Sequence, residues 1–461
     1  MQATSARSKS LRDPEFHERL QQLRRTDNVT NLYYLARTWA VLAAAIGGTI
    51  WFHQSEACAA APFWAKCAVA LAAIVVVGAG QHQLTGLAHE ASHHTLFRNR
   101  IWNDLASDWF CMFPMFSCTH HYRLQHMAHH QFVNDPERDP DVSQLRASGH
   151  WLRFPIARAA FLGTLARQLW LPNLVKYIRV RAKYNSIGTD KNPYQKKGAR
   201  TSKIPVLVGV GYMLGLVAAL TALRLTNQAA LLLAVPAAMW GAAAAFYAFL
   251  PASMYHQSRV RPTISNRSMT LMRITFITIL FTSIAWASRS YGLLAPGYFL
   301  LLWVAPIFTS FSFFMVLRQI VQHGNGGRGW LTNTRVFRVN PIIEFCVFPM
   351  GQDYHLPHHM YATVPHYRLP QLHALLLEHP EYRREAVEVE GYFLPKERPP
   401  VKPTVLDVLS RPTTVPANGA FIDNSVLEGN EVEEKEQILQ EGRISAGLEA
   451  EAVRAPLTAA G

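Results

Sequence analysis

Three histidine-rich stretches contain the residues of this chain whose types and spacing could do chemistry. The first is His89-Glu90-Ala91-Ser92-His93-His94. Residues four apart lie on one face of a helix, so His89 and His93 would point the same way. Two neutral imidazoles in that arrangement can bind one transition-metal ion. His94 would be rotated sideways, toward a second ligand position.

The same stretch also matches the HExxH pattern of zinc proteases, in which Glu90 would be the general base. A zinc protease needs three protein ligands and one open position. This chain has two further clusters, His126-x2-His129-His130 and His355-x2-His358-His359. Three imidazole clusters favour a site with two metal ions. Iron in such a site can activate dioxygen and oxidise an unactivated C–H bond, whereas zinc has no redox chemistry.

The composition indicates an integral membrane protein. The chain has 461 residues, of which 49% are hydrophobic and only 16% are charged. The apolar residues gather in blocks of about 20, the length that crosses a bilayer core. The net charge of +14 could indicate nucleic acid binding, but it is also what positive-inside membrane topology produces. With apolar spans present, we expect a membrane partner and no nucleic acid.

The predicted fold is all-α, with four to six transmembrane helices and a cytoplasmic, histidine-rich di-iron cap. The expected spans are residues 32–52, 63–88, 204–223, 229–250, 271–286 and 298–321. If residues 1–30, 95–203, 251–270 and 322–461 share one side, most of the positive charge lies there, which makes that side cytoplasmic. All three histidine clusters then lie on the same side.

The chain divides into three predicted regions. Residues 1–30 form a polar N-terminal segment, and residues 31–394 form the membrane domain. Residues 395–461 carry prolines and then a run of glutamates, which predicts a flexible acidic tail.

The order and spacing of the three clusters resemble the membrane fatty acid desaturase superfamily, whose members carry three histidine boxes. The flanking sequences at residues 134–141, 354–361 and 364–370 also resemble this family. The resemblance implies a non-haem di-iron enzyme with the metal ligands His89, His93, His94, His126, His129, His130, His355, His358 and His359. The family often adds one more histidine after the last span, and His323 fits that place. Gln322 departs from the family, which frequently has an acidic residue there.

Carboxylates beside the boxes are expected to support the chemistry. In a di-iron site, Glu90 and Asp353 would orient imidazoles by accepting their second N–H, and Asp139 could do the same. The resemblance implies two iron ions as cofactors and dioxygen as co-substrate. Because the sequence shows no haem, flavin or iron–sulfur motif, the electrons would come from a separate ferredoxin- or cytochrome-b5-like donor.

The expected function is therefore that of an oxidoreductase, a dioxygen-dependent desaturase acting on a fatty acyl chain. A hydroxylase, ketolase or oxidative decarboxylase of a lipid could use the same scaffold. A metal transporter is a further alternative, but its ligands would lie near the bilayer midplane rather than at one boundary.

Overall fold

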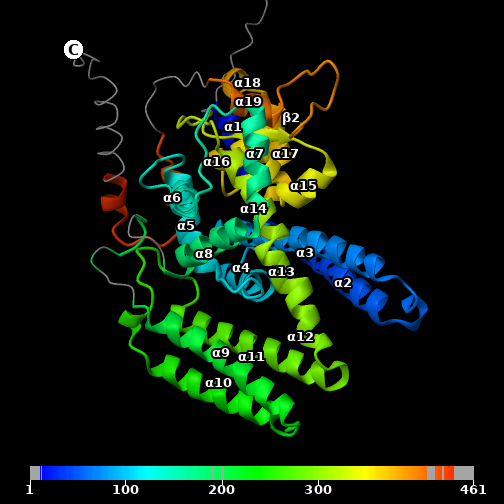
Figure 1. Ribbon diagram of the computed structural model, residues 1–461. Helices are drawn as coiled ribbons and strands as arrows, with labels where there is room; N and C mark the ends of the chain where they lie inside the picture. Colours follow the sequence, from blue (N-terminus) through cyan, green and yellow to red (C-terminus); the bar gives the residue numbers. More distant parts are fainter. Residues whose placement is uncertain are drawn as a thin grey trace, which may run out of the picture.

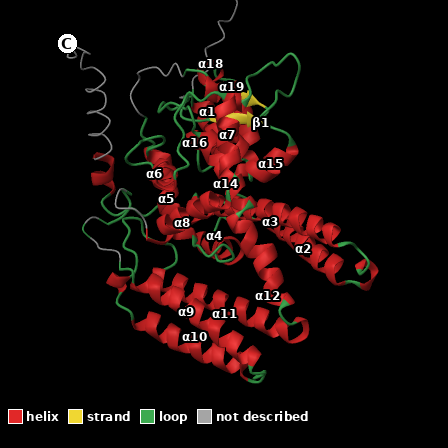
Figure 2. Cartoon of the chain, viewed as in Figure 1, coloured by secondary structure: helices red, strands yellow, loops and turns green. Residues whose placement is uncertain are grey.

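The computed structural model describes Leu11, Gly198 and residues 13–187, 192–196, 202–412, 421–427 and 430–440. Helices dominate these residues, and the sheet within them has two short parallel strands (Figures 1 and 2). The predicted all-α, multi-span fold class is confirmed.

The α-helices and strands lie along the chain in a simple order. Their bounds are α1 (Pro14–Leu23), α2 (Thr30–Gln54), α3 (Phe63–Ser92), α4 (Arg100–Ser107), α5 (Thr119–Gln131), α6 (Pro140–Ser148), α7 (Arg158–Gln168), α8 (Leu171–Ile187), α9 (Ile204–Leu225), α10 (Leu231–Phe249), α11 (Asn266–Tyr291), α12 (Leu294–Phe299), α13 (Ala305–Phe308), α14 (Ser310–Gln322), β1 (Arg335–Arg338), α15 (Pro341–Val347), α16 (His355–Met360), α17 (Leu369–Leu377), α18 (Pro380–Glu385), β2 (Val387–Glu390) and α19 (Val405–Ser410). Short 3-10 and π turns connect them at η1 (Glu56–Cys58), η2 (Asp108–Met112), η3 (Ala252–Met254), η4 (Leu300–Val304), η5 (Gln352–Tyr354), η6 (His366–Arg368) and η7 (Asn424–Leu427).

Among the described residues, six helical stretches are long and apolar enough to cross a membrane. They are Thr30–Gln54, Phe63–Ser92, Ile204–Leu225, Leu231–Phe249, Asn266–Tyr291 and Leu294–Gln322. These match the six expected spans to within a few residues at most ends. The last span is a run of helical pieces, α12 to α14, with a π turn at η4.

The spans form two groups in Figure 1. Helices α2 and α3 make one antiparallel pair, and α9, α10 and α11 pack together as another unit. The run α12 to α14 leads from the second group back to α3. Gly78 permits the crossing of α3 and α14, because a Cβ placed there would lie 2.6 Å from the backbone nitrogen of Phe311. The Ser310 hydroxyl donates to the Ile74 carbonyl at 2.6 Å across this crossing.

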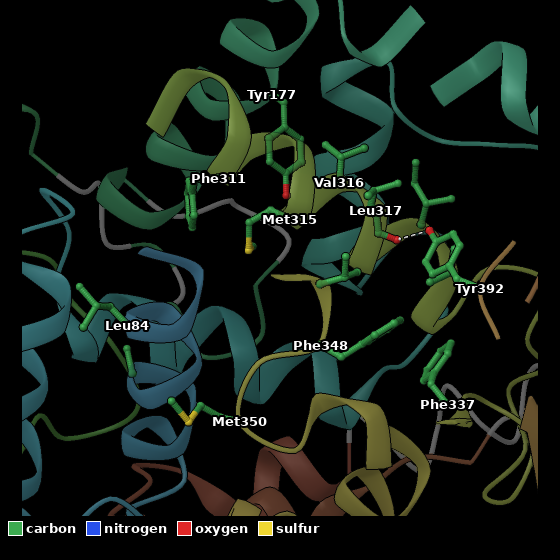
Figure 3. Close-up of a cluster of buried hydrophobic side chains, with 14 of the residues drawn as sticks. Leu84, Tyr177, Phe311, Met315, Val316, Leu317, Phe337, Phe348, Met350 and Tyr392 are labelled. Carbon is green, nitrogen blue, oxygen red and sulfur yellow. Dashed lines mark hydrogen bonds between the residues drawn. The ribbon is translucent and has the colours of Figure 1, made fainter. Parts of the chain in front are cut away.

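The largest hydrophobic core lies where α3, α14 and the C-terminal segments meet. Figure 3 shows Leu84 of α3 and Met350 in this core, together with Met315 of α14. On the other side of α14, the Tyr392 hydroxyl donates to the Leu317 carbonyl at 3.0 Å. The core therefore ties the end of the last span to residues 347–350, which lead into the third histidine box.

Parts of the predicted C-terminal tail, residues 395–461, contact the rest of the protein. Val405 and Leu409 of α19 are buried in the main core. Val426 and Leu427 of η7 pack against Leu124 and Met127 of α5. These contacts place described portions of the segment beside the helix of the second histidine box.

Candidate metal centre

The first histidine box lies at the end of α3, where the helix leaves the span. His89 is inside the last turn, and His93 is the C-cap residue. Arg123 of α5 holds this helix end, because its guanidinium donates to the carbonyls of Ser92 at 3.0 Å and Ala91 at 2.8 Å. Asp104 accepts two further hydrogen bonds from Arg123, at 2.5 and 2.9 Å. The position of His93 therefore depends on a buried ion pair between two other helices.

Helix α5 carries the second box, and its helical spacing divides the box between two groups of rings. His126 and His130 are four residues apart and lie on the same face. His129 points elsewhere, since neighbouring helical residues differ by about 100° in direction. The third box on α16 repeats the pattern, with His355 and His359 on one face and His358 on another.

Nine imidazoles converge into two groups. The first group contains His89, His93, His126, His130 and His358, and the second contains His129, His323, His355 and His359. Within each group, one nitrogen from every ring lies within 4.8 Å of the others. The rings of His130 and His359, one from each group, stack with centroids 4.1 Å apart, so the two groups are adjacent.

The spacing of the ring nitrogens fits metal binding. In the first group, the Nε2 atoms of His93 and His126 are 2.8 Å apart, and those of His130 and His358 are 3.0 Å apart. Two nitrogens about 2.1 Å from one metal ion and at right angles to each other would be separated by about 3.0 Å.

The contacts of the Nδ1 atoms, on the side of each ring away from the group, also fit metal binding. The Nδ1 of His129 lies 3.0 Å from a carboxylate oxygen of Asp139, and the Nδ1 of His323 lies 3.0 Å from the carbonyl of Asn333. These oxygens only accept, so each Nδ1 must carry the proton. When both rings are neutral, the form that binds a metal ion, their Nε2 atoms are both acceptors and face each other at 3.1 Å. A cation between them satisfies both lone pairs.

Comparison with known proteins shows which protein family this chain belongs to. A family model described as fatty acid desaturase matches residues 62–270 and 252–388, which together cover most of the chain. The chain belongs to the fatty acid desaturase family.

Two named proteins are similar to parts of this desaturase-family chain. It is 33% identical over 152 residues to dihydrorhizobitoxine desaturase from Bradyrhizobium elkanii, a match covering 32% of this chain and 38% of that protein. It is 30% identical over 110 residues to Delta(5) fatty acid desaturase fat-4 from Caenorhabditis elegans, covering 24% of this chain and 23% of that protein. The chain thus matches well under half the length of either relative.

Carboxylates position imidazoles at two points of this desaturase-family site. Glu90 has one oxygen 3.3 Å from Nδ1 of His89, and its other oxygen accepts from the backbone N–H of His366 at 2.8 Å. Burial lowers the pKa of His129, but attraction to the Asp139 and Asp141 carboxylates and the hydrogen bond to Asp139 together raise that pKa to about 9. A metal ion would therefore displace a proton from this ring when it binds. A carboxylate that fixes a ring in this way also makes it a stronger electron donor to a cation.

At four other rings outside the spans, no nearby carboxylate in the described part of the chain offsets burial. Burial, with repulsion between neighbouring imidazoles, lowers the pKa of His126, His130, His355 and His359 well below the usual range. These four rings are therefore neutral near pH 7, the form that binds a metal ion.

The structure does not bring two of the expected residues into the site. His94 belongs to neither group; its backbone has a positive φ of 58°, and its Nε2 lies 3.3 Å from Oδ1 of Asn430. The chain leaves the helix after Ser92, so helical spacing no longer sets the direction of His94. No described hydrogen bond or ion pair joins Asp353 to a histidine. Burial and repulsion from Glu344 raise the pKa of Asp353 to about 7 instead.

Sequence reasoning missed a polar bridge beside the first group. The amide nitrogen of Gln352 lies 3.1 Å from Nε2 of His89, and its oxygen accepts from Gln322 at 2.9 Å. This bridge links α14 to α3 through η5. Gln352 precedes the third box by three residues, but glutamine has no ligand signature that would distinguish it.

Proposed function

We propose that this chain is an oxidoreductase, a dioxygen-dependent di-iron desaturase that introduces a double bond into a fatty acyl substrate. The observation that carries the proposal is the convergence of nine imidazoles into two adjacent groups in a chain of the desaturase family. One relative is named for a fatty acid and the other for dihydrorhizobitoxine. The family implies a lipid substrate, and both names support desaturation.

Each histidine group would hold one iron ion, and bound iron supplies the redox chemistry that dioxygen activation requires. The balance of the reaction is simple. Two hydrogen atoms leave adjacent substrate carbons, a donor supplies two electrons, two protons come from solvent, and dioxygen is reduced to two molecules of water. Asp139 and Glu90 hold the rings of His129 and His89 in place during this cycle.

The electrons would come from a separate ferredoxin- or cytochrome-b5-like protein. The positive-inside rule supports a cytoplasmic location for the histidine boxes. A basic cytoplasmic face would attract an acidic donor through long-range electrostatics. The net charge of +14 fits such a face.

A hydroxylase, ketolase or oxidative decarboxylase remains the second candidate, because each shares the first hydrogen abstraction with a desaturase. Lipid analysis by mass spectrometry of cells expressing the chain separates them. A desaturase product is two hydrogens lighter than its substrate, whereas a hydroxylase product gains one oxygen.

His93 and His94 offer a matched test of the metal site. They are adjacent and chemically identical, but the structure places only His93 in a group. We expect His93→Ala to lose iron, measured by inductively coupled plasma mass spectrometry, and to lose product. His94→Ala should retain most of its iron. Equal iron loss in both variants would contradict the nine-ligand assignment.

A further inference from the structure

A polar cavity borders both histidine groups. It is lined by His89 and His126 of the first group and by His129 and His355 of the second. Its volume is about 30 Å³, and its walls come from α3, α5, α6, α8, α14, η5 and α16. A molecule bound in this cavity would contact both histidine groups.

The lining of this cavity does not suit a bare alkyl chain. Apart from the histidines, it consists of Tyr122, Gln125, Pro140, Asp141, Gln144, Arg181, Tyr184, Asn185, Arg318, Gln319, Gln322 and Gln352. Only Pro140 lacks a polar side-chain group. Sites for apolar ligands are lined predominantly by hydrophobic side chains with a few polar groups, which is the reverse of this pattern.

Arg318 is a buried cation of this cavity, and in the part of the chain that the structure describes it forms no ion pair within 4 Å; Asp141 attracts it from farther away. Its side chain is only 7% exposed, and its one hydrogen bond is a weak contact to the Met315 sulfur at 3.4 Å. Its Nε has no partner. Burying an unpaired charge costs several kcal/mol by order of magnitude. A cation held in this way is suited to an anion that the protein itself does not provide.

Two glutamines add unused hydrogen-bonding groups to the same cavity. Gln125 Oε1 and Gln144 Nε2 have no partner, and these side chains are 9% and 4% exposed. Asp141 also lines the cavity, but its side chain is 37% exposed, and its nearest ion-pair partner is Nδ1 of His129 at 4.0 Å. Arg181 also lines the cavity, so its two arginines outnumber its one carboxylate, that of Asp141. Buried polar groups are normally paired, so these orphans indicate a polar ligand.

We propose that this cavity binds the carboxylate of the substrate. Arg318 would pair with the carboxylate, and Gln125 and Gln144 would contact polar atoms of the substrate beside it. The inference rests on the proposed function and narrows its substrate class. Arg318 and His323 are five residues apart on one helix, about 7.5 Å along its axis. The C–H bond that is oxidised would therefore lie only a few bonds from the carboxylate.

Two sources could supply this carboxylate, a free fatty acid or an amino acid, and matched probes distinguish them. We would measure binding of octanoate, octan-1-ol, methyl octanoate and 2-aminooctanoate to the metal-loaded protein in nanodiscs by calorimetry, with empty nanodiscs subtracted. We expect octanoate or 2-aminooctanoate to bind at least tenfold more tightly than the alcohol and the ester. The tighter of the two acids identifies the source.

Arg318→Met tests the anchor without depending on activity. Replacing an unpaired buried cation by an apolar side chain of similar length should leave thermal stability unchanged or raise it. The preference for the acid over the alcohol should nevertheless disappear. A purely structural arginine would give the opposite result, a loss of stability with the preference intact.

Arg335 provides a matched control for this variant. It is 2% exposed and also has unpartnered guanidinium nitrogens, but it does not line the cavity. Arg335→Met should keep the acid preference. The proposal fails if the unmodified protein binds octan-1-ol as tightly as octanoate, or if Arg318→Met still prefers the acid. Binding requires neither dioxygen nor an electron donor, so that failure would leave desaturation by the proposed di-iron site intact.

Discussion

Replacing Arg123 should destabilise the protein more than any surface charge substitution. Its guanidinium is 1% exposed and joins three helices, because it bonds to Asp104 of α4 and to two carbonyls at the end of α3. Removing one partner of a buried ion pair costs about 3–5 kcal/mol, since the other charge remains buried and unpaired. Arg123→Met should therefore leave Asp104 without its counter-ion.

Thermal unfolding in detergent, followed by intrinsic fluorescence, measures this loss. A domain of about 150–250 residues shifts by about 2–4 °C per kcal/mol, and a longer chain shifts less. We expect the midpoint to fall by roughly 5–10 °C. Iron content should fall as well, because His93 directly follows a carbonyl that Arg123 holds.

The control is Arg261, whose ion pair with Glu431 is exposed, with side chains 74% and 67% accessible. Arg261→Ala should cost about 0–1 kcal/mol. The double variant Arg123→Met, Asp104→Leu should recover part of the loss, because no unpaired charge remains. Equal midpoints for the Arg123 and Arg261 variants, or no recovery in the double variant, would refute the reasoning.

Three further predictions concern packing, metal binding and pH. Gly78→Ala should destabilise by about 1–3 kcal/mol through overpacking against α14, measured by thermal unfolding. Asp139→Asn should weaken metal affinity about 10–100-fold, measured by competition with a chelator, because His129 loses its carboxylate partner. His373 is the main cause of a lowered pKa of Glu388, with Lys402 and Arg338 adding to it. The Glu388 carboxylate therefore stabilises the fold above the unfolded pKa of about 4.3, and the stability gap to Glu388→Gln should close as the pH falls below that value.

Each of these has a control in the same chain. Gly47 of α2 has nothing within 4 Å of an added Cβ, so Gly47→Ala should be neutral or stabilising. Asp407 caps α19 away from the histidines, so Asp407→Asn should keep full metal affinity. Within the described ranges, the ion pair of Glu385 is the exposed one with Arg384, so Glu385→Gln should show little pH-dependent difference. If a control variant behaved like its test variant, the physical reason given for that prediction would be wrong.

Helix α14 contributes both to the polar cavity and to the second histidine group. Helix α14 supplies Arg318 to the cavity wall and ends beside His323 of the second group. The helix that would anchor a substrate therefore also positions an imidazole of the second group. A substrate that shifted α14 would disturb both at once, so the rigid core around Met315 serves the site as well as the fold.

The amino-acid sequence by itself determined the spans and the histidine boxes. Both signals are local, because an apolar run of about 20 residues and a four-residue ligand spacing are properties of a single helix. The six spans follow from this, and so does the division of His126, His129 and His130 between two directions. The resemblance to desaturases was likewise visible in the order of the boxes.

Only the tertiary structure decided which rings meet. His130 and His358 lie 228 positions apart in the chain, yet their Nε2 atoms are 3.0 Å apart. The backbone turn at His94 removes that ring from both groups, and Asp139 rather than Asp353 contacts one of the grouped imidazoles. The burial of Arg318 also depends on α3, α5, α6, α8 and α16 closing against α14. Periodicity sets the direction of a side chain within one helix, but contacts between helices depend on how the whole chain packs.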